Sequence, residues 1–225
     1  YIEKHKIELN RLREKEIKLI IGDIRKQLRK YSGMFQKSPK DRLEMLEKDE
    51  IEDLLKTHTS TAERINFYPK LKKIIKSLKA KLILDLGAGL NPIALAEKGI
   101  KYCAIDINEE NIMLIKDFFK KKNISGKAFV YDLKKISSLP KTDICLIFKV
   151  LDIIEEKGHN AAKRIIEKIN SKYILISFAK KTLSGKQMRY TRRKWLERLL
   201  DKKKWAYKIL NSDNEIFYLI ERKEG

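Results

Sequence analysis

The sequence predicts an α/β protein of the Rossmann-like class, with a seven-stranded, mostly parallel sheet, a C-terminal antiparallel hairpin and a small N-terminal helical module. From about residue 80, short apolar runs rich in Ile, Val and Tyr alternate with helical stretches. This alternation is typical of parallel strands that are covered on both faces. The 225 residues, of which 43% are hydrophobic, suffice for one such domain and a small additional module.

The helical module is expected over residues 1–56 and the α/β domain over residues 57–225. From Ile7 onward, apolar residues recur at near-helical spacing among charged ones. A further helix is expected to start at Pro39, because proline is accepted in the first turn of a helix. Its apolar stripe continues to Leu55.

Strands are predicted from five apolar runs, at Leu82–Leu86, Tyr102–Ile107, Ala128–Tyr131, Ile144–Phe148 and Tyr173–Phe178. Helices are expected between them, as at Glu109–Lys121 and His159–Ile169. Two further strand-like runs, Ala206–Leu210 and Ile216–Ile220, flank the turn-like segment Asn211–Glu215, which predicts a hairpin. A parallel sheet with such an antiparallel end is the layout of methyltransferases that use S-adenosylmethionine (SAM).

The strongest local signal is a glycine-rich turn that follows the first strand. Gly87 and Gly89 allow a tight turn and a close approach of a ligand to the backbone. Pro92 stands where a dinucleotide-binding fingerprint has its third glycine, which disfavours an NAD-dependent enzyme as the alternative. Asp85, just before the turn, is typical of methyltransferases, where a carboxylate orients the amino-acid end of SAM.

Acids follow three successive strands, at Asp85, Asp106 and Asp132. Ligands of open α/β sheets bind at the carboxyl ends of the strands. There, Asp106 is placed to accept hydrogen bonds from both ribose hydroxyls, and Asp132 from the adenine amino group. Any one of these acids alone fits a loop or a helix cap. The set of three favours a SAM site.

Five segments carry a resemblance to a known family. Residues 58–64 read His-Thr-Ser-Thr-Ala-Glu-Arg, and residues 89–95 read Gly-Leu-Asn-Pro-Ile-Ala-Leu. Three further segments follow in order: residues 146–149, Ser177-Phe178 together with residues 182–185, and residues 216–220. Together they resemble the aminoglycoside-resistance 16S rRNA methyltransferases that modify guanine N7 in the decoding site. The resemblance covers roughly residues 57 to 225 and implies a SAM-dependent enzyme that acts on small-subunit rRNA.

The resemblance also implies roles for individual residues. Arg64 is expected to pair with the carboxylate of SAM, for which a guanidinium offers a bidentate fork; a surface ion pair, for example with Glu63, is the alternative. Phe148 and Lys149 are the catalytic candidates beside the methyl group, although Phe148 also fits the core. His58 begins the first of the resembling segments, but it fits the start of a helix equally well. The expected cofactor contacts are Arg64, Asp85, Gly87, Gly89, Asn91, Asp106, Ile107, Asp132, Leu133 and Phe148.

The charge of the chain points to a polyanionic partner. With 52 Lys and Arg against 31 acids, the net charge is +21. A Lys-rich, thermophile-like surface is the alternative, but the excess here has one sign. Between Ala179 and Lys208, twelve cations and two acids give a net of +10. We expect RNA contacts from Lys180, Lys181, Lys186, Met188, Arg189, Tyr190, Arg192 and Arg193, and from the N-terminal module. Met188 and Tyr190 are placed to stack on a flipped base.

Alternatives for the target remain. Guanine N7 has a free lone pair and needs no general base, whereas enzymes that methylate exocyclic amines often carry an Asn/Asp-Pro-Pro-Tyr motif at the fourth strand. This chain has Phe148–Leu151 at that position and so lacks the motif, which favours a ring nitrogen as the methylated atom. Cytosine N4 stays open, because the N-terminal part is shorter than in the family and Ala179–Lys181 lacks a usual Pro. A non-catalytic rRNA-binding or ribosome-assembly protein is the alternative from another class, and the three acids disfavour it.

The partner is expected to be 16S rRNA or the 30S small ribosomal subunit, bound by a monomer in the cytoplasm. No apolar run approaches the roughly 20 residues of a membrane span, and no signal peptide is seen. The three histidines show no ligand spacing, so no metal is expected.

Overall fold

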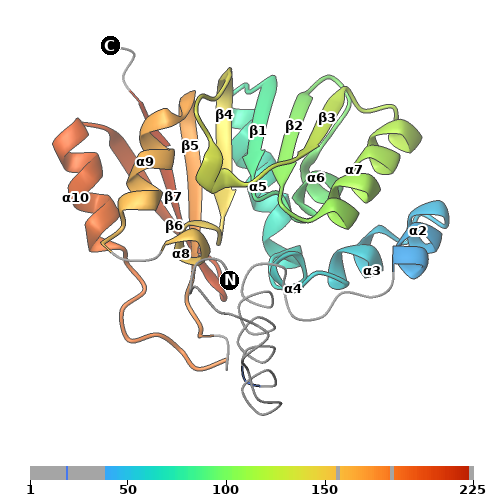
Figure 1. Cartoon of the computed structure of the whole chain (residues 1–225), viewed down its shortest axis with the longest axis horizontal. Coiled ribbons are helices and arrows are strands. Elements are labelled where there is room, and N and C mark those ends of the chain that lie inside the picture. The colour runs from blue at the N-terminus through green and yellow to red at the C-terminus, as the bar shows by residue number, and fades with distance from the viewer. Residues whose placement is uncertain (1–18, 20–38, 156–157, 183–184, 223–225) are drawn as a thin grey trace, which may run out of the picture.

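A computed structural model of the chain describes residue 19 and residues 39–155, 158–182 and 185–222. One sheet contains seven strands in the order β3-β2-β1-β4-β5-β7-β6 (Figure 1). The strands are β1 (Leu82–Leu86), β2 (Lys101–Asp106), β3 (Gly126–Val130), β4 (Lys141–Phe148), β5 (Asn170–Ala179), β6 (Ala206–Asn211) and β7 (Glu215–Glu221). Strands β1 to β5 pair in parallel, and β7 is antiparallel to both β5 and β6. The predicted fold class is therefore confirmed.

The C-terminal hairpin has a tighter turn than the sequence predicted. Asn211 ends β6 and Glu215 begins β7, so both residues belong to strands. The Ser212 hydroxyl closes the turn by accepting a hydrogen bond from the Glu215 amide at 3.0 Å. A backbone hydrogen bond of 2.9 Å from the Ser212 amide to the Glu215 carbonyl completes it. This places the Glu215 side chain inside the protein rather than in a solvated loop.

Helices cover both faces of the sheet. The first face carries α2 (Pro39–Glu47), α3 (Ile51–Lys56), α5 (Tyr68–Ser77), α6 (Asn91–Leu95) and α7 (Glu109–Lys122). The second carries α8 (Leu151–Ile154), α9 (Asn160–Lys168) and α10 (Lys194–Lys203). The short elements α4 (Thr59–Ala62), η3 (Ile65–Phe67) and η4 (Leu133–Lys135) complete the described part. Each described helix is too short or too polar to cross a bilayer.

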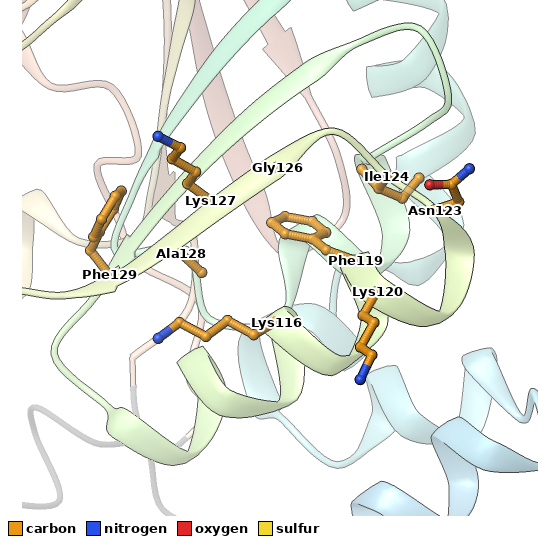
Figure 2. A pocket seen from close by; sticks show the side chains of 9 residues that line it. All are labelled: Lys116, Phe119, Lys120, Asn123, Ile124, Gly126, Lys127, Ala128 and Phe129. Atoms are coloured by element: carbon orange, nitrogen blue, oxygen red, sulfur yellow. The ribbon is translucent and has the colours of Figure 1, made fainter.

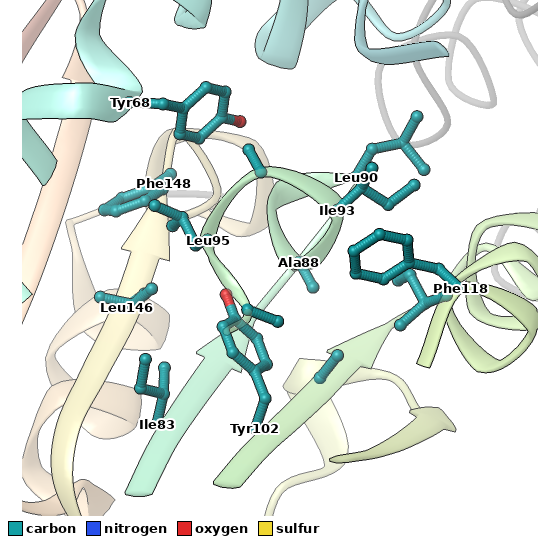
Figure 3. Close-up of a cluster of buried hydrophobic side chains, with 14 of the residues drawn as sticks. Tyr68, Ile83, Ala88, Leu90, Ile93, Leu95, Tyr102, Phe118, Leu146 and Phe148 are labelled. Carbon is teal, nitrogen blue, oxygen red and sulfur yellow. The ribbon is translucent and has the colours of Figure 1, made fainter. Parts of the chain in front are cut away.

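The buried cluster on the first face lies directly beneath the glycine-rich turn. Figure 3 shows Ile83, Leu146 and Tyr102 of three neighbouring strands together with Ala88 of the turn. A fully buried large apolar side chain stabilises a fold by about 1.5–3 kcal/mol relative to an exposed one. The packing that holds the sheet together therefore also fixes the position of the turn.

Helix α7 shows why the sequence folds this way locally. The Asn108 side chain caps its start by accepting a hydrogen bond from the Asn111 amide at 2.9 Å. Two acids lie in its first turn and three lysines in its last, which complements the helix dipole. Asn123 ends the helix in the left-handed conformation, with φ of 51°.

Helices α2 and α3 pack into the core of the α/β domain. Leu46, Leu54 and Leu55 are buried there. The buried Arg42 donates hydrogen bonds to Thr57 at 3.0 Å and to Asn111 of α7 at 3.1 Å. The start of α2 at Pro39 confirms the predicted helix start. Residues 1–18 and 20–38 of the expected module lie outside the described residues, so the division after residue 56 stays a prediction.

Candidate active site

The glycine-rich turn between β1 and α6 is closely packed. Gly87 and Gly89 have positive φ angles of 70° and 51°. The Gly87 amide donates a hydrogen bond of 2.8 Å to the Ile105 carbonyl of β2. A Cβ atom on Gly87 would lie 2.1 Å from the Val150 side chain, and one on Gly89 would lie 2.9 Å from the His58 ring. Glycine is needed at both positions for backbone conformation and for space.

Asp106 fixes the turn from the neighbouring strand. Its Oδ2 accepts a hydrogen bond of 2.7 Å from the Gly89 amide, and its Oδ1 accepts one of 2.8 Å from the Asn108 amide. Burial raises the pKa of this carboxyl group, while the backbone donors act in the opposite direction. Each oxygen keeps a second lone pair for a further donor. The predicted strand-end acid is therefore positioned at the turn.

Asp85 lies fully buried at the end of β1. The Tyr102 hydroxyl donates a hydrogen bond of 2.7 Å to its Oδ2, and Oδ1 has no hydrogen-bond partner among the described residues. Burial raises the pKa of Asp85 to about 7, although hydrogen bonding from Tyr102 and Asn91 and the charge of Arg64 oppose the shift. A buried carboxylate oxygen without a donor suits a positively charged N–H group of a ligand.

Asp132 completes the row of strand-end acids. It accepts a hydrogen bond of 2.9 Å from the Lys134 amide and so caps η4. The Tyr131 amide donates to the Asp106 carbonyl at 2.9 Å, which ties the end of β3 to the end of β2. Leu133 is buried and Ile107 is 52% exposed. The three acids thus follow adjacent strands, β1, β2 and β3, at one edge of the sheet.

Arg64 lies in a buried polar network on the first face. Its Nη1 donates to Asn91 Oδ1 at 2.6 Å, and its Nη2 lies 2.9 Å from the Glu215 carboxylate. The Ser177 hydroxyl donates to the same carboxylate at 2.5 Å. The guanidinium also lies 4.7 Å from the centroid of the Phe148 ring. The alternative of a surface ion pair with Glu63 is wrong, because Arg64 is buried and a different acid faces it.

Two features of this network, the Nε atom of Arg64 and the side chain of Asn91, bear on the cofactor role expected of Arg64. Its Nε has no hydrogen-bond partner among the described residues. Asn91, which starts α6 directly after the turn, also accepts a hydrogen bond of 2.8 Å from the Tyr68 hydroxyl. Arg64 therefore holds the turn in place through Asn91. Its contact with a cofactor carboxylate stays a prediction.

Phe148 and Lys149 differ in their surroundings. Phe148 is buried and packs edge-on against Phe217, with 5.6 Å between ring centroids. Lys149 follows the end of β4 and forms an ion pair with Glu63. Its φ of 59° is unusual for a residue that ends a strand rather than a helix. Such backbone strain clusters at functional sites. The catalytic role of both residues stays a prediction.

His58 combines the two interpretations that the sequence left open. It is the N-cap residue of α4, but its side chain makes no capping hydrogen bond. Its ring instead lies against Gly89 of the glycine-rich turn. Burial lowers the pKa of His58 to about 4, and the nearby cations Arg42, Arg64 and Lys149 lower it further. The imidazole is therefore neutral at physiological pH.

The basic segment after β5 contains side chains held by other elements and side chains exposed to solvent; among the exposed ones, the Arg189 guanidinium lies 5.3 Å from the centroid of the Tyr190 ring. Lys180 and Lys181 donate hydrogen bonds to Ser212 and Asn214 of the hairpin turn, at 2.8 and 2.9 Å. Arg192 forms a double hydrogen bond with Glu197, and Arg193 pairs with Asp152 at 2.7 Å and stacks on Phe178. Lys186, Arg189 and Tyr190 are exposed, Tyr190 by 71%, and Met188 is half-buried. Figure 1 shows this segment extending beyond the sheet at the same end as α4 and α8.

The sequence did not reveal the partners that hold the site. Glu215, Tyr68 and Tyr102 were not among the expected contacts, and Ser177 was noted only as part of a motif. The one signal available in the sequence concerned Glu215, an acid that directly precedes the apolar run of β7. Within the described part of the chain, no group of His, Cys, Asp and Glu side chains has the arrangement of a metal site.

Comparisons with known proteins show which family the chain resembles. A family model described as ribosomal RNA methyltransferase (FmrO) matches residues 46–219. The 16S rRNA (guanine(1405)-N(7))-methyltransferase of Serratia marcescens is 29% identical over 142 residues, which cover 61% of this chain and 55% of that protein. The enzyme of the same name from Micromonospora echinospora is 25% identical over 178 residues, covering 75% and 64%. The chain thus spans between about half and two thirds of the length of these curated relatives.

Solved structures show the same architecture. The 16S rRNA methylase RmtB superposes with a TM-score of 0.77 at 24% identity, over 92% of this chain and 83% of that one. The 16S rRNA methylase ArmA gives a TM-score of 0.62 at 26% identity, over 83% of this chain and 99% of that one. The methyltransferase RmtF, solved in complex with S-adenosyl-L-homocysteine, gives 0.75 at 20% identity, over 88% and 82%.

Proposed function

The chain belongs to the ribosomal RNA methyltransferase (FmrO) family, and from this premise we propose that it methylates a base of 16S rRNA near the decoding site, at guanine N7, with SAM as the methyl donor. One observation carries the proposal. The carboxylates of Asp85, Asp106 and Asp132 follow three adjacent strands, and that of Asp106 accepts a hydrogen bond from the glycine-rich turn itself. The curated relatives named above are guanine-N7 methyltransferases of 16S rRNA, which supports the choice of target atom.

The residues at this edge fit the chemical groups of SAM. Asp106 is positioned to accept hydrogen bonds from ribose hydroxyls, and the end of β3 presents Asp132 and Leu133 to the adenine. The unpartnered Oδ1 of Asp85 suits the ammonium group of the methionine end. Arg64 Nε is a donor for the carboxylate of the same end. When bound, SAM supplies a methyl group on a sulfonium, which is already activated, so alignment is the main contribution of the protein.

The end of β4 favours a target that needs no general base. Glu63 is the acid beside Lys149, and its ion pair with that lysine makes it a poor proton acceptor. Glu215 is likewise held by Arg64 and Ser177. Guanine N7 presents a lone pair and loses no proton during methyl transfer, whereas the amine of cytosine N4 must lose one. Cytosine N4 is therefore the less favoured target.

The RNA is bound, in this proposal, by the exposed members of the basic segment. Lys186 and Arg189 supply positive charge, and Tyr190 supplies an exposed ring for stacking. Lys180, Lys181, Arg192 and Arg193 mainly shape the segment. The substrate is 16S rRNA, free or within the 30S subunit, and the enzyme acts as a monomer in the cytoplasm.

Nucleoside mapping tests the proposal. Purified 30S subunits that lack the modification are incubated with the protein and SAM, and their 16S rRNA is digested and analysed by mass spectrometry. We expect 7-methylguanosine in a fragment of the decoding region, and no product without SAM. Methylation at cytosine N4 instead would show that this atom, and not guanine N7, is the target. Absence of any new methyl group, with RNA binding retained, would identify a non-catalytic rRNA-binding protein instead.

A further inference from the structure

A series of contacts joins the basic segment after β5 to the end of β4 through the turn between β6 and β7. Lys181 of the basic segment donates a hydrogen bond of 2.9 Å to Asn214 Oδ1. Asn214 Nδ2 in turn donates one of 3.1 Å to the backbone carbonyl of Glu63, and the Glu63 carboxylate pairs with Lys149. Three segments that are far apart in the sequence therefore meet at the side chain of Asn214.

The amide of Asn214 is suited to this junction by its chemistry. An ammonium group only donates hydrogen bonds and a carbonyl only accepts them, so a residue between Lys181 and Glu63 must offer both an acceptor and a donor. A side-chain amide offers both on one planar group, whereas a carboxylate offers acceptors alone. The two partners also fix the orientation of the amide, with Oδ1 toward Lys181 and Nδ2 toward Glu63.

A role in the turn alone does not account for the side chain of Asn214. Asparagine is common in turns because it tolerates the left-handed conformation and can hydrogen-bond nearby backbone. Here the turn is closed by Ser212 and Glu215, and Asn214 is not one of the described residues with a positive φ. Its backbone carbonyl accepts a hydrogen bond of 2.8 Å from the Lys180 amide, but its side chain contacts segments outside the turn.

The end of β4 depends on the position of Glu63. The Lys149 side chain is only 16% exposed, so its ammonium group needs the counter-charge that Glu63 supplies. The Lys149 amide also donates a hydrogen bond of 3.0 Å to the Ser177 carbonyl. Glu63 directly precedes Arg64, which donates to Asn91 beside the glycine-rich turn. A displacement of Glu63 therefore affects both the end of β4 and the surroundings of that turn.

The groove along the edge strand β3 gives no reason to place RNA there instead (Figure 2). Phe119 is buried. Lys127 and Phe129 lie on the opposite face of β3 from Lys116 and Lys120 of α7, because side chains alternate along a strand and Ala128 is the one that packs toward α7. The basic segment thus remains the RNA surface of the proposed function, and its ties to the rest of the protein determine where the RNA lies.

We propose that Asn214 is a positioning residue for methyl transfer, which holds the basic segment in register with Glu63 and, through Glu63, with Lys149. The inference rests on the proposed function, in which RNA binds the basic segment and a base is methylated at the end of β4. RNA on the segment then presents its base at a fixed place relative to the methyl group. Because alignment is the main contribution to catalysis here, a loosened junction slows transfer without weakening binding.

Asn214→Asp tests the junction, because it removes one of its two halves. The carboxylate keeps an acceptor for Lys181 but loses the donor to Glu63. We expect kcat of rRNA methylation to fall by about 10- to 100-fold, as for a misplaced reactant, while KM for SAM and the affinity for 30S subunits stay within about twofold. Asn211→Asp makes the same charge change at an exposed side chain of the same hairpin and should match the wild type.

A second variant tests whether the two hydrogen bonds of the amide act together. Lys181→Met should lower kcat at saturating RNA. Combined with Asn214→Asp, it should add no more than about a twofold loss, because the tie to Glu63 is already broken and the two effects are not independent. Losses that multiply would contradict a single junction. So would an unchanged kcat in Asn214→Asp, an equal fall in Asn211→Asp, or a loss of SAM or RNA affinity in place of kcat.

Hydrogen exchange measured by mass spectrometry supplies a readout that needs no activity. The peptide that covers residues 59–67 should exchange faster in Asn214→Asp than in the wild type, and equally fast in Asn211→Asp and the wild type. Unchanged exchange in Asn214→Asp would overturn the junction. If the wild type transfers no methyl group, the proposed function fails, and the exchange result alone decides whether Asn214 holds the Glu63 segment.

Discussion

The charges beside the glycine-rich turn and those of the basic segment after β5 are organised in opposite ways. At the turn, Arg64 and Glu215 are almost inaccessible to solvent and each has several partners. In the segment, Lys186 and Arg189 are exposed, and no acid pairs with either among the described residues. A buried ion requires compensation, whereas exposed cations are stable in water without a partner.

This difference separates two tasks of the molecule. The buried pair connects the start of β7 with Asn91, the residue directly after the turn, so it fixes the shape of the proposed cofactor site. The exposed cations contribute little to stability and remain available for phosphates. Substitutions in the first region should therefore affect folding and SAM binding, and those in the second should affect only RNA.

The largest effect is expected from Glu215→Ala. The variant leaves the Arg64 guanidinium buried without its counter-charge, which costs about 3–5 kcal/mol of unfolding free energy. Urea denaturation followed by circular dichroism measures this loss. Glu52→Ala removes one of the two acids that pair with the exposed Lys56, the other being Asp53, and should cost at most about 1 kcal/mol. Equal losses in both variants would contradict the distinction between the two kinds of ion pair.

Asp106→Ala should weaken SAM binding by about 10- to 100-fold. Hydrogen bonds to a charged group contribute roughly 1.5–3 kcal/mol each, and the substitution also releases the Gly89 amide. Calorimetric titration with SAM measures the affinity. Asp117→Ala, on the exposed side of α7, serves as the control and should bind as the wild type does. Unchanged affinity in Asp106→Ala would refute the ribose role of this carboxylate.

The affinity for SAM should also depend on pH through Asp85. Its pKa of about 7 means that the carboxyl group is neutral below that pH and ionised above it. If the ionised form accepts the ammonium group of SAM, the affinity decreases as the pH falls below 7, by at most about tenfold per pH unit. Asp85→Asn should bind weakly at every pH, with a flat profile between pH 5 and 8. A flat profile in the wild type would exclude this role.

The smallest effect is expected in the basic segment. Lys186→Glu should lower the rate of rRNA methylation by roughly tenfold, because it removes a phosphate contact and adds repulsion. Its SAM affinity should stay within about twofold of the wild type. Lys202→Glu makes the same charge change in α10 and should leave methylation nearly unaffected. Equal methylation rates in the two variants would count against the placement of RNA on Lys186.

The same comparison explains what could be predicted from the sequence. The strands and their terminal acids were predictable, because apolar runs are local and parallel strands end at one edge. The partnership of Arg64 and Glu215 was not, since the two residues are 151 positions apart and no local pattern links them. In the basic segment, the excess of positive charge could be counted directly from the sequence. Which cations are engaged, such as Arg193 with Asp152, depends on the folded path of the chain.

The most direct test of the site is a calorimetric titration of the wild-type chain with SAM. We expect binding of about one SAM per chain, with S-adenosyl-L-homocysteine competing for the same site. Absence of binding by both compounds, in a protein shown by circular dichroism to be folded, would contradict the assignment of the three strand-end carboxylates to a cofactor.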